Sequence, residues 1–191
     1  MITWIVIGAI IVVLLFVVVG AYNKLVALDQ EANQAFADID VQLKQRQDLI
    51  PNLVETVKGY AAHESGTLEA VVAARNAAAR AGSVEEKVQA ENVLTGALGR
   101  LFALAEAYPD LKANTNFLSL QGELADLENK LAAARRFFNN AVGEFNTVRR
   151  AFPNVLFAGA FGFPRDRTFF DVGDEARTAM NEAPPQVKFG A

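Results

Sequence analysis

The chain has 191 residues, a net charge of −4 and a pI of about 5.1. This acidic balance excludes the basic surface that a nucleic-acid-binding protein requires, and no polybasic stretch favours charge-driven binding to anionic lipid. The chain has no cysteine, so cysteine usage does not indicate its redox compartment.

The first segment of the chain is apolar and carries no charge. Residues Ile2 to Ala21 read ITWIVIGAIIVVLLFVVVGA, which as an α-helix is about 30 Å long and matches the hydrocarbon thickness of a bilayer. Trp4 and Tyr22 lie near its two ends, where amphipathic aromatic side chains anchor at the lipid–water boundary. We therefore predict a transmembrane anchor over residues 1–22, with the lipid bilayer as a partner.

A cleaved signal peptide is the alternative interpretation of this segment. No Lys or Arg precedes the apolar run and no A-x-A cleavage site follows it, so we expect a retained, single-pass anchor. Lys24 is the nearest cation and follows the run. The positive-inside rule then places the N-terminus outside and the rest of the chain in the cytoplasm.

A long helix is predicted to leave the membrane directly, because no break residue separates it from the anchor. Leu25, Leu28 and Ala32 open its apolar seam, which continues to Tyr60. Pro51 lies inside the pattern and predicts a helix kink, since proline removes one backbone hydrogen bond. We expect the helix to end within residues 63–66.

Two shorter helices are predicted next. One runs from Leu68 to about Ala81, and the other begins at Ser83, which forms a capping box with Glu86, and ends at Pro109. The last helix has a seam with alternating steps of three and four residues, typical of a coiled coil. Asn114 or Asn116 caps its start and Pro153 stops it. The seam consists of Phe117, Leu120, Leu124, Leu127, Leu131, Ala134, Phe138, Ala141, Phe145, Val148 and Phe152.

These elements predict an all-α fold with a single N-terminal transmembrane helix followed by an up-down antiparallel bundle over residues 23–152. The two short helices cover only the outer half of the long ones. The inner halves of the first and last helices then pair near the membrane and lack other partners, so we expect a homo-oligomer.

Residues 153–191 form the third predicted region, an irregular tail rich in Phe, Gly and Pro. Six of the fourteen phenylalanines lie between Phe152 and Phe170. The tail either packs on its own bundle, faces lipid or contacts another subunit. The candidate residues for an oligomer or membrane contact are Phe157, Phe161, Phe163, Phe169 and Phe170.

The order of several motifs resembles the LemA family over residues 1–170. They are NKLV at 23–26, IDVQLK at 39–44, RQDLIPNLV at 46–54, VKGY at 57–60 with His63-Glu64, AEAYPDLKA at 105–113, Leu120-Gln121, Leu127-Glu128-Asn129, ARRFFN at 134–139 and Phe145-Asn146. The resemblance implies a bacterial protein with an N-terminal anchor, a short external N-terminus and a cytoplasmic helical bundle. It brings no established biochemical activity. Phe138 and Phe145 stand where the family pattern leads us to expect tyrosine, so neither position offers a phenol.

The sequence offers no candidate catalytic residue, cofactor site or metal site. His63 is the only histidine, and neither a Glu-x-x-His pair nor a phosphate-binding loop is present. The remaining polar candidates either fix the register of the bundle or form a binding surface near Pro51. They are Asp48, Asn52, Glu106, Gln121, Arg135, Asn139 and Asn146.

Two functions fit these features. The first is a non-enzymatic membrane-anchored helical scaffold that self-associates and organises or shapes the membrane. The alternative is an adaptor that presents the bundle to another membrane protein or signalling protein.

Overall fold

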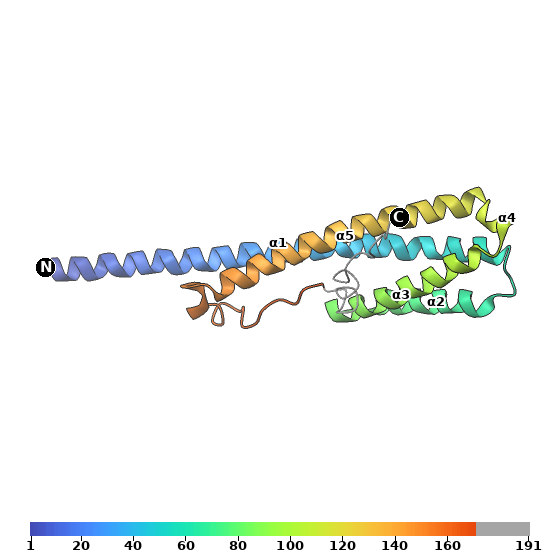
Figure 1. Cartoon of the computed structure of the whole chain (residues 1–191). Coiled ribbons are helices and arrows are strands. Elements are labelled where there is room, and N and C mark those ends of the chain that lie inside the picture. The colour runs from blue at the N-terminus through green and yellow to red at the C-terminus, as the bar shows by residue number, and fades with distance from the viewer. Residues whose placement is uncertain (171–191) are drawn as a thin grey trace, which may run out of the picture.

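A computed structural model describes residues 1–170, and this part of the chain contains helices and no strand (Figure 1). The all-α prediction is therefore confirmed. The part of the predicted tail region beyond residue 170 lies outside the described residues. The elements are α1 (Ile2–Lys58), α2 (Ser65–Arg80), α3 (Val84–Ala105), α4 (Pro109–Lys112), α5 (Thr115–Arg150) and the 3-10 turn η1 (Asn154–Leu156).

Helix α1 is a single element of 57 residues that contains both the apolar segment and the first helix of the bundle. It is the one helix among residues 1–170 that is long and apolar enough to cross a membrane. Its most apolar window has a mean hydropathy of 3.2, and none of that window is buried within the chain. Pro51 lies inside α1, which continues to Lys58; the kink at Pro51 stays a prediction.

The end predicted for this helix within residues 63–66 is wrong. The chain leaves α1 at Gly59, and the amides of Tyr60 and Ala61 both donate to the Val57 carbonyl, which tightens the last turn. Ala61 is then buried in the core at 2% exposure, and this contact draws the connection inward. Ser65 begins α2 instead of ending α1.

The caps predicted for α3 and α5 are present. The Glu86 amide donates to Ser83 Oγ at 3.1 Å, and Glu86 Oε2 accepts from the Ser83 amide at 3.2 Å. At α5, the Phe117 amide donates to Asn114 Oδ1 at 3.0 Å, so Asn114 is the cap. These side chains satisfy amides that a helix start leaves without an intrahelical partner.

The helices pack as an elongated bundle in which α5 runs back along α1 (Figure 1). The α2–α3 hairpin packs against only the part of α1 farthest from the apolar segment, which we call the distal part, as the helix lengths predicted (Figure 1). The distal core is therefore built from all of these helices, with Leu53, Val71, Leu94, Leu101 and Phe117 among its buried side chains.

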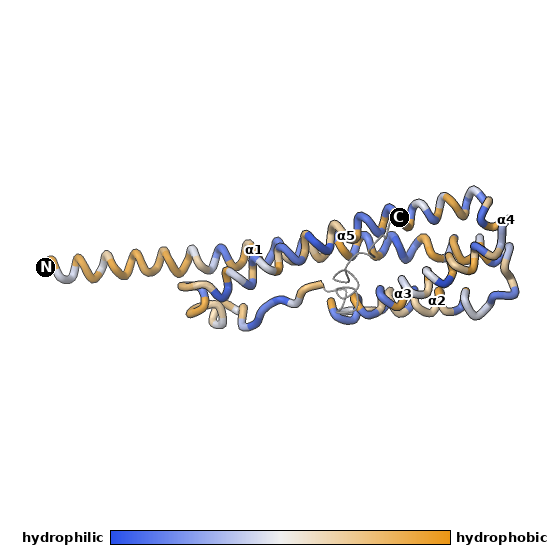
Figure 2. Tube along the Cα trace, viewed as in Figure 1, coloured by the Kyte–Doolittle hydropathy of each residue, from blue (hydrophilic) through white to orange (hydrophobic). Residues whose placement is uncertain are grey.

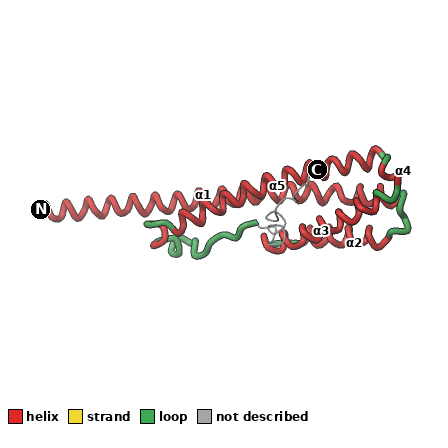
Figure 3. The backbone as a smooth tube through the Cα atoms, viewed as in Figure 1, coloured by secondary structure: helices red, strands yellow, loops and turns green. Residues whose placement is uncertain are grey.

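The inner half is built differently. From α3, Val84 and Val88 near its start pack there, but α1 and α5 supply the rest of its helical residues. The segment after α5 turns at η1 and runs back over these two helices as a loop (Figure 3). Ala158 and Phe170 from this segment are buried against residues of α1 and α5, and Phe161 and Phe163 are partly buried there. The expectation that the inner halves lack other partners is thus corrected: the tail covers them.

Candidate functional site

A buried ion pair joins α1 to α3 at the centre of the bundle. Arg46 of α1 is 5% exposed and Glu91 of α3 is 2% exposed. Arg46 Nη1 donates to Glu91 Oε2 at 3.0 Å, and its Nη2 donates to Thr95 Oγ1 at 3.0 Å. Glu128 of α5 lies 3.3 Å from Arg46 Nη1, so one guanidinium links three helices.

The charges of this cluster are incompletely compensated. Burial raises the pKa of Glu91, and this loss of hydration outweighs the opposing attraction of Arg46. Burial likewise lowers the pKa of Arg135, which lies 3.9 Å from Glu128. Within residues 1–170, the buried atoms Glu91 Oε1, Gln42 Oε1 and Arg135 Nε have no hydrogen-bond partner. Because one guanidinium contacts side chains of α3 and α5, the geometry of the cluster fixes the register of three helices.

A second polar arrangement holds the tail on α5. The Asn139 side chain donates to the Phe170 carbonyl at 3.0 Å and accepts from the Phe170 amide at 2.8 Å. The Asn146 side chain makes the same pair of bonds with Arg167, at 3.0 and 2.8 Å. The two asparagines are one heptad apart, about 10.5 Å along a helix, and the two tail residues are about 10 Å apart when extended. We call this pair the asparagine ladder.

Ion pairs fasten the same segment to both long helices. Arg167 reaches α1, where its Nη2 lies 2.7 Å from Asp29 Oδ1, and its guanidinium lies 5.6 Å from the ring centroid of Phe145. Asp166 pairs with Arg149 and Arg150 at the end of α5. The tail is thus held by directional polar contacts as well as by buried apolar side chains.

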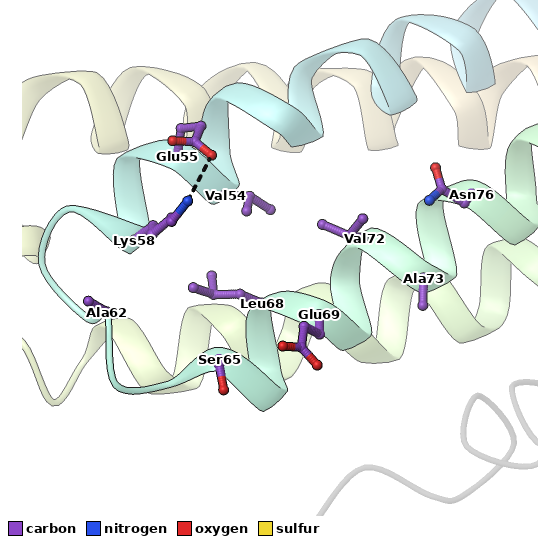
Figure 4. A pocket seen from close by; sticks show the side chains of 10 residues that line it. All are labelled: Val54, Glu55, Lys58, Ala62, Ser65, Leu68, Glu69, Val72, Ala73 and Asn76. Atoms are coloured by element: carbon purple, nitrogen blue, oxygen red, sulfur yellow. Dashed lines mark ion pairs between the residues drawn. The ribbon is translucent and has the colours of Figure 1, made fainter.

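An open groove lies at the distal end of the bundle, between α1 and α2 (Figure 4). Its volume is about 510 Å³, and Val54, Leu68 and Val72 supply its apolar surface. Glu55 and Lys58 form an ion pair of 3.6 Å at its rim. Apolar walls with a charged rim are typical of a site that takes an apolar side chain from a binding partner.

The structure disperses most of the predicted site residues. Trp4 is 77% exposed near the start of α1, and Tyr22 packs edge-on against Phe161 with ring centroids 5.2 Å apart. The predicted tail contacts have different environments. Phe157, Phe161 and Phe163 are half-buried, Phe169 is 46% exposed and Phe170 is 2% exposed within its own bundle.

The remaining polar candidates do not form one surface near Pro51. Asn139 and Asn146 bind the tail, Arg135 joins the buried charge cluster, and Glu106 pairs with Lys112 far from both. His63 is exposed in the connection between α1 and α2. Within residues 1–170, no group of three or more His, Asp or Glu side chains could hold a metal ion.

Comparison with known proteins decides the family. The sequence matches the LemA family over residues 35–189, which include helices α2 to α5 and the last 24 residues of the 57-residue α1. This chain belongs to the LemA family. The family assignment therefore confirms the resemblance seen in the sequence motifs.

Three relatives of this LemA-family chain show how far the similarity extends. Magnetosome protein MamQ of Magnetospirillum gryphiswaldense is 23% identical over 176 residues, which cover 78% of this chain and 65% of the relative. Protein LemA of Metamycoplasma hominis is 29% identical over 137 residues, which cover 69% of this chain and 61% of the relative. Magnetosome protein MamQ 2 of Paramagnetospirillum magneticum is 22% identical over 174 residues, which cover 78% of this chain and 64% of the relative. The matched part of the chain thus spans less than two thirds of these relatives.

The sequence did contain a signal for the buried ion pair that our sequence analysis missed. Arg46 lies between Leu43 and Ile50 at steps of three and four residues, so it occupies a seam position of α1. Glu91 occupies the matching seam position three residues before Leu94 in α3. A charged residue at a seam position on each of two neighbouring helices indicates a buried pair.

Proposed function

We propose that this LemA-family chain is a non-enzymatic, membrane-anchored helical scaffold that self-associates and organises the membrane around it. The observation that carries the proposal is the unbroken α1, which joins the apolar segment to the bundle in one helix of about 85 Å. A continuous helix transmits the orientation of the anchor to the bundle. A set of such chains would hold rigid rods at a fixed angle to the bilayer.

The apolar segment is the surface that we propose for self-association. Its side chains are exposed, and a Cβ added at Gly8 or Gly20 would meet no atom within 4 Å. Small residues in a membrane span allow another helix to approach closely. The seam of α5 is a poorer candidate, because the chain itself covers residues such as Leu131 and Phe145.

The orientation that we propose places the N-terminus outside and the bundle in the cytoplasm, since Lys24 follows the apolar run. A cysteine can report this directly because the chain has none of its own. In intact cells, Thr3→Cys should react with an impermeant thiol reagent and Glu85→Cys should not. The opposite pattern of labelling would reverse the orientation.

The alternative function is an adaptor, and the distal groove favours it. The groove is lined by the last turns of α1 and by α2. The end of α1 lies at the end of the bundle farthest from the apolar segment (Figure 1). In that case Val54, Leu68 and Val72 would receive an apolar side chain of the partner. An adaptor needs no contact between copies of the chain.

Mass photometry of the full chain in nanodiscs separates the two functions. The scaffold predicts several chains per disc, and Gly20→Leu should shift the distribution toward one chain. Val13→Leu is the matched control, because Val13 is exposed in the same segment and is already large. A single chain in every disc would contradict the scaffold function and leave the adaptor function as the proposal.

A further inference from the structure

Three large apolar side chains are exposed close together at the 3-10 turn η1, one of them two residues before the turn and two within it. Phe152 is 81% exposed, Val155 52% and Leu156 66%, and all three lie within five residues of the chain. Elsewhere on the bundle, the exposed apolar side chains are scattered over separate helices. These include Val41, Val72, Val93, Leu118 and Phe137. The turn is therefore the one place in residues 23–170 where consecutive residues present such a patch.

The other face of the turn is fixed to the bundle. Asn154 is 9% exposed, and its side-chain amide donates to the Val148 carbonyl of α5 at 2.9 Å. Phe157 stacks on Phe161 with ring centroids 5.9 Å apart, and Ala158 is buried against α1 and α5. The turn is thus two-sided, and the outward direction of its apolar side chains is set by these inward contacts.

The position of the turn identifies what covers the patch. Phe161 contacts Tyr22, the first residue after the uncharged run, with ring centroids 5.2 Å apart. Ala158 shares a cluster with Leu25, one helical turn beyond the run. Figure 2 shows the apolar turn beside the point where α1 changes from apolar to polar. If the run spans a bilayer, the patch lies at the level of the lipid–water boundary.

We propose that Phe152, Val155 and Leu156 insert into the bilayer interface beside the anchor, so that each chain contacts the membrane at a second place. The occupant of the patch is lipid, because the patch adjoins the end of the apolar segment and faces away from its own bundle. Insertion is driven by apolar burial and therefore occurs in uncharged lipid. The inserted side chains add volume to only one leaflet of the bilayer, the one on the bundle side, and so act as a wedge. This inference rests on the proposed membrane anchor.

Tryptophan quenching tests the insertion in the full chain. The chain has one tryptophan, so Trp4→Phe gives a silent background into which Phe152→Trp is introduced. In nanodiscs of phosphatidylcholine brominated in its acyl chains, Trp at 152 should emit at shorter wavelength and be quenched. The matched control is Phe137→Trp in the same background, at a half-exposed position on α5 about 22 Å farther from the membrane. Its emission should be typical of water and unquenched.

The outcomes separate this inference from the anchor on which it rests. In the unmodified chain, Trp4 reports the anchor, and an unquenched Trp4 would remove the proposed membrane span itself. Quenched Trp4 with unquenched, water-exposed Trp at 152 would overturn only the insertion of the turn. A blue-shifted but unquenched Trp at 152 would also overturn it, because protein from a second copy would then cover the patch.

A spin label provides a second measurement that does not depend on an aromatic substitution. Leu156→Cys and Leu118→Cys are matched, since both leucines are exposed and the chain has no other cysteine. In nanodiscs, a label at 156 should be more accessible to oxygen than to a water-soluble nickel complex. A label at 118, near the start of α5, should show the reverse. Equal preference for nickel at both positions would contradict insertion.

Discussion

The two halves of the bundle reach a similar degree of burial by different means. In the distal half, helices pack on helices, and leucine, valine and alanine side chains supply the core. In the inner half, a segment without a long helix covers α1 and α5. Its turns over residues 151–163 pair their own backbone groups, whereas the extended stretch that follows is bonded to side chains of α5. There the Asn139 and Asn146 side chains pair with backbone amides and carbonyls of the loop. A helix therefore needs only an apolar stripe to pack on the bundle. A docked loop also needs side chains that form hydrogen bonds with its backbone amides and carbonyls.

The buried ion pair lies where these two halves meet, and we expect its loss to have the largest effect. Arg46→Met leaves the Glu91 carboxylate buried without its 3.0 Å partner, which should cost about 3–5 kcal/mol of unfolding free energy. Glu91→Gln should cost only about 1 kcal/mol, because Arg46 keeps Glu128 and Thr95. Denaturant unfolding of the full chain in detergent measures both, with exposed Lys44→Met as the control. Equal losses at the two positions would contradict this asymmetry.

The same variant has a predicted pH dependence. The pKa of Glu91 is already raised above 4.5 by burial, and removal of Arg46 raises it further. A carboxyl with a raised folded-state pKa contributes stability that is fully present below pH 4.5 and lost as pH rises through the raised pKa. The deficit of Arg46→Met relative to the unmodified chain should therefore shrink as the pH is lowered from neutral toward 4.5. A deficit that grows on acidification would contradict the sign.

A substitution in the asparagine ladder should lower the unfolding free energy by less, but it tests the difference between the two halves of the bundle more directly. Asn139→Ala leaves the amide and carbonyl of Phe170 without partners, which should cost about 1–3 kcal/mol. The loss should be local: hydrogen exchange should accelerate at Phe170 and Arg167 but not at Leu101 in the distal half. Exposed Asn129→Ala on the same helix is the control. Faster exchange at Leu101 would mean that the two halves unfold as one unit.

These two sites show how far the sequence can be interpreted. Helical periodicity located the helices and the capping-box motif located the Ser83 cap, because both signals are local in the chain. The sequence also singled out Asn139 and Asn146 as polar candidates. It could not pair them with Arg167 and Phe170, since the loop between has no period and its path depends on the packing of α1 against α5. The Arg46–Glu91 pair could have been predicted from the seam positions of the two residues. The apolar neighbours at the same spacing, however, indicate the seam more strongly than a charged residue does.

The tail shows the opposite case, in which composition singled out a segment but did not separate its buried residues from its exposed ones. The phenylalanine content left open whether the tail packs on its own bundle, faces lipid or contacts another subunit, and Phe170 was among the candidates for the last two. Phe170 is in fact 2% exposed, with the Arg135 guanidinium 5.1 Å from its ring centroid. Phe152, Val155 and Leu156 are the exposed ones. Phenylalanine count alone cannot separate the two faces of a turn, because a turn has no fixed period.

A smaller effect is expected at the Ser83 cap, which starts α3 where Val84 and Val88 pack against the inner half. Ser83→Ala removes the acceptor for the Glu86 amide and should cost about 1 kcal/mol. Thermal unfolding of the full chain measures the loss, and Ser119→Ala inside α5 is the control. The ladder-bound tail should keep its hydrogen-exchange protection in Ser83→Ala. An unchanged melting temperature would show that the capping box contributes nothing to the α2–α3 hairpin.

The smallest effect is expected at His63, in the connection that closes the distal end. Its side chain is exposed, and no group of three or more His, Asp or Glu side chains in residues 1–170 could share a metal ion with it. His63→Gln should therefore change the unfolding free energy by no more than about 0.5 kcal/mol, as is usual for surface substitutions away from special features. Elemental analysis of the purified chain should find no stoichiometric transition metal before or after chelation. One bound metal per chain that disappears in His63→Gln would give the distal end a role as a metal site, and the contrast between the two halves would then be chemical as well as structural.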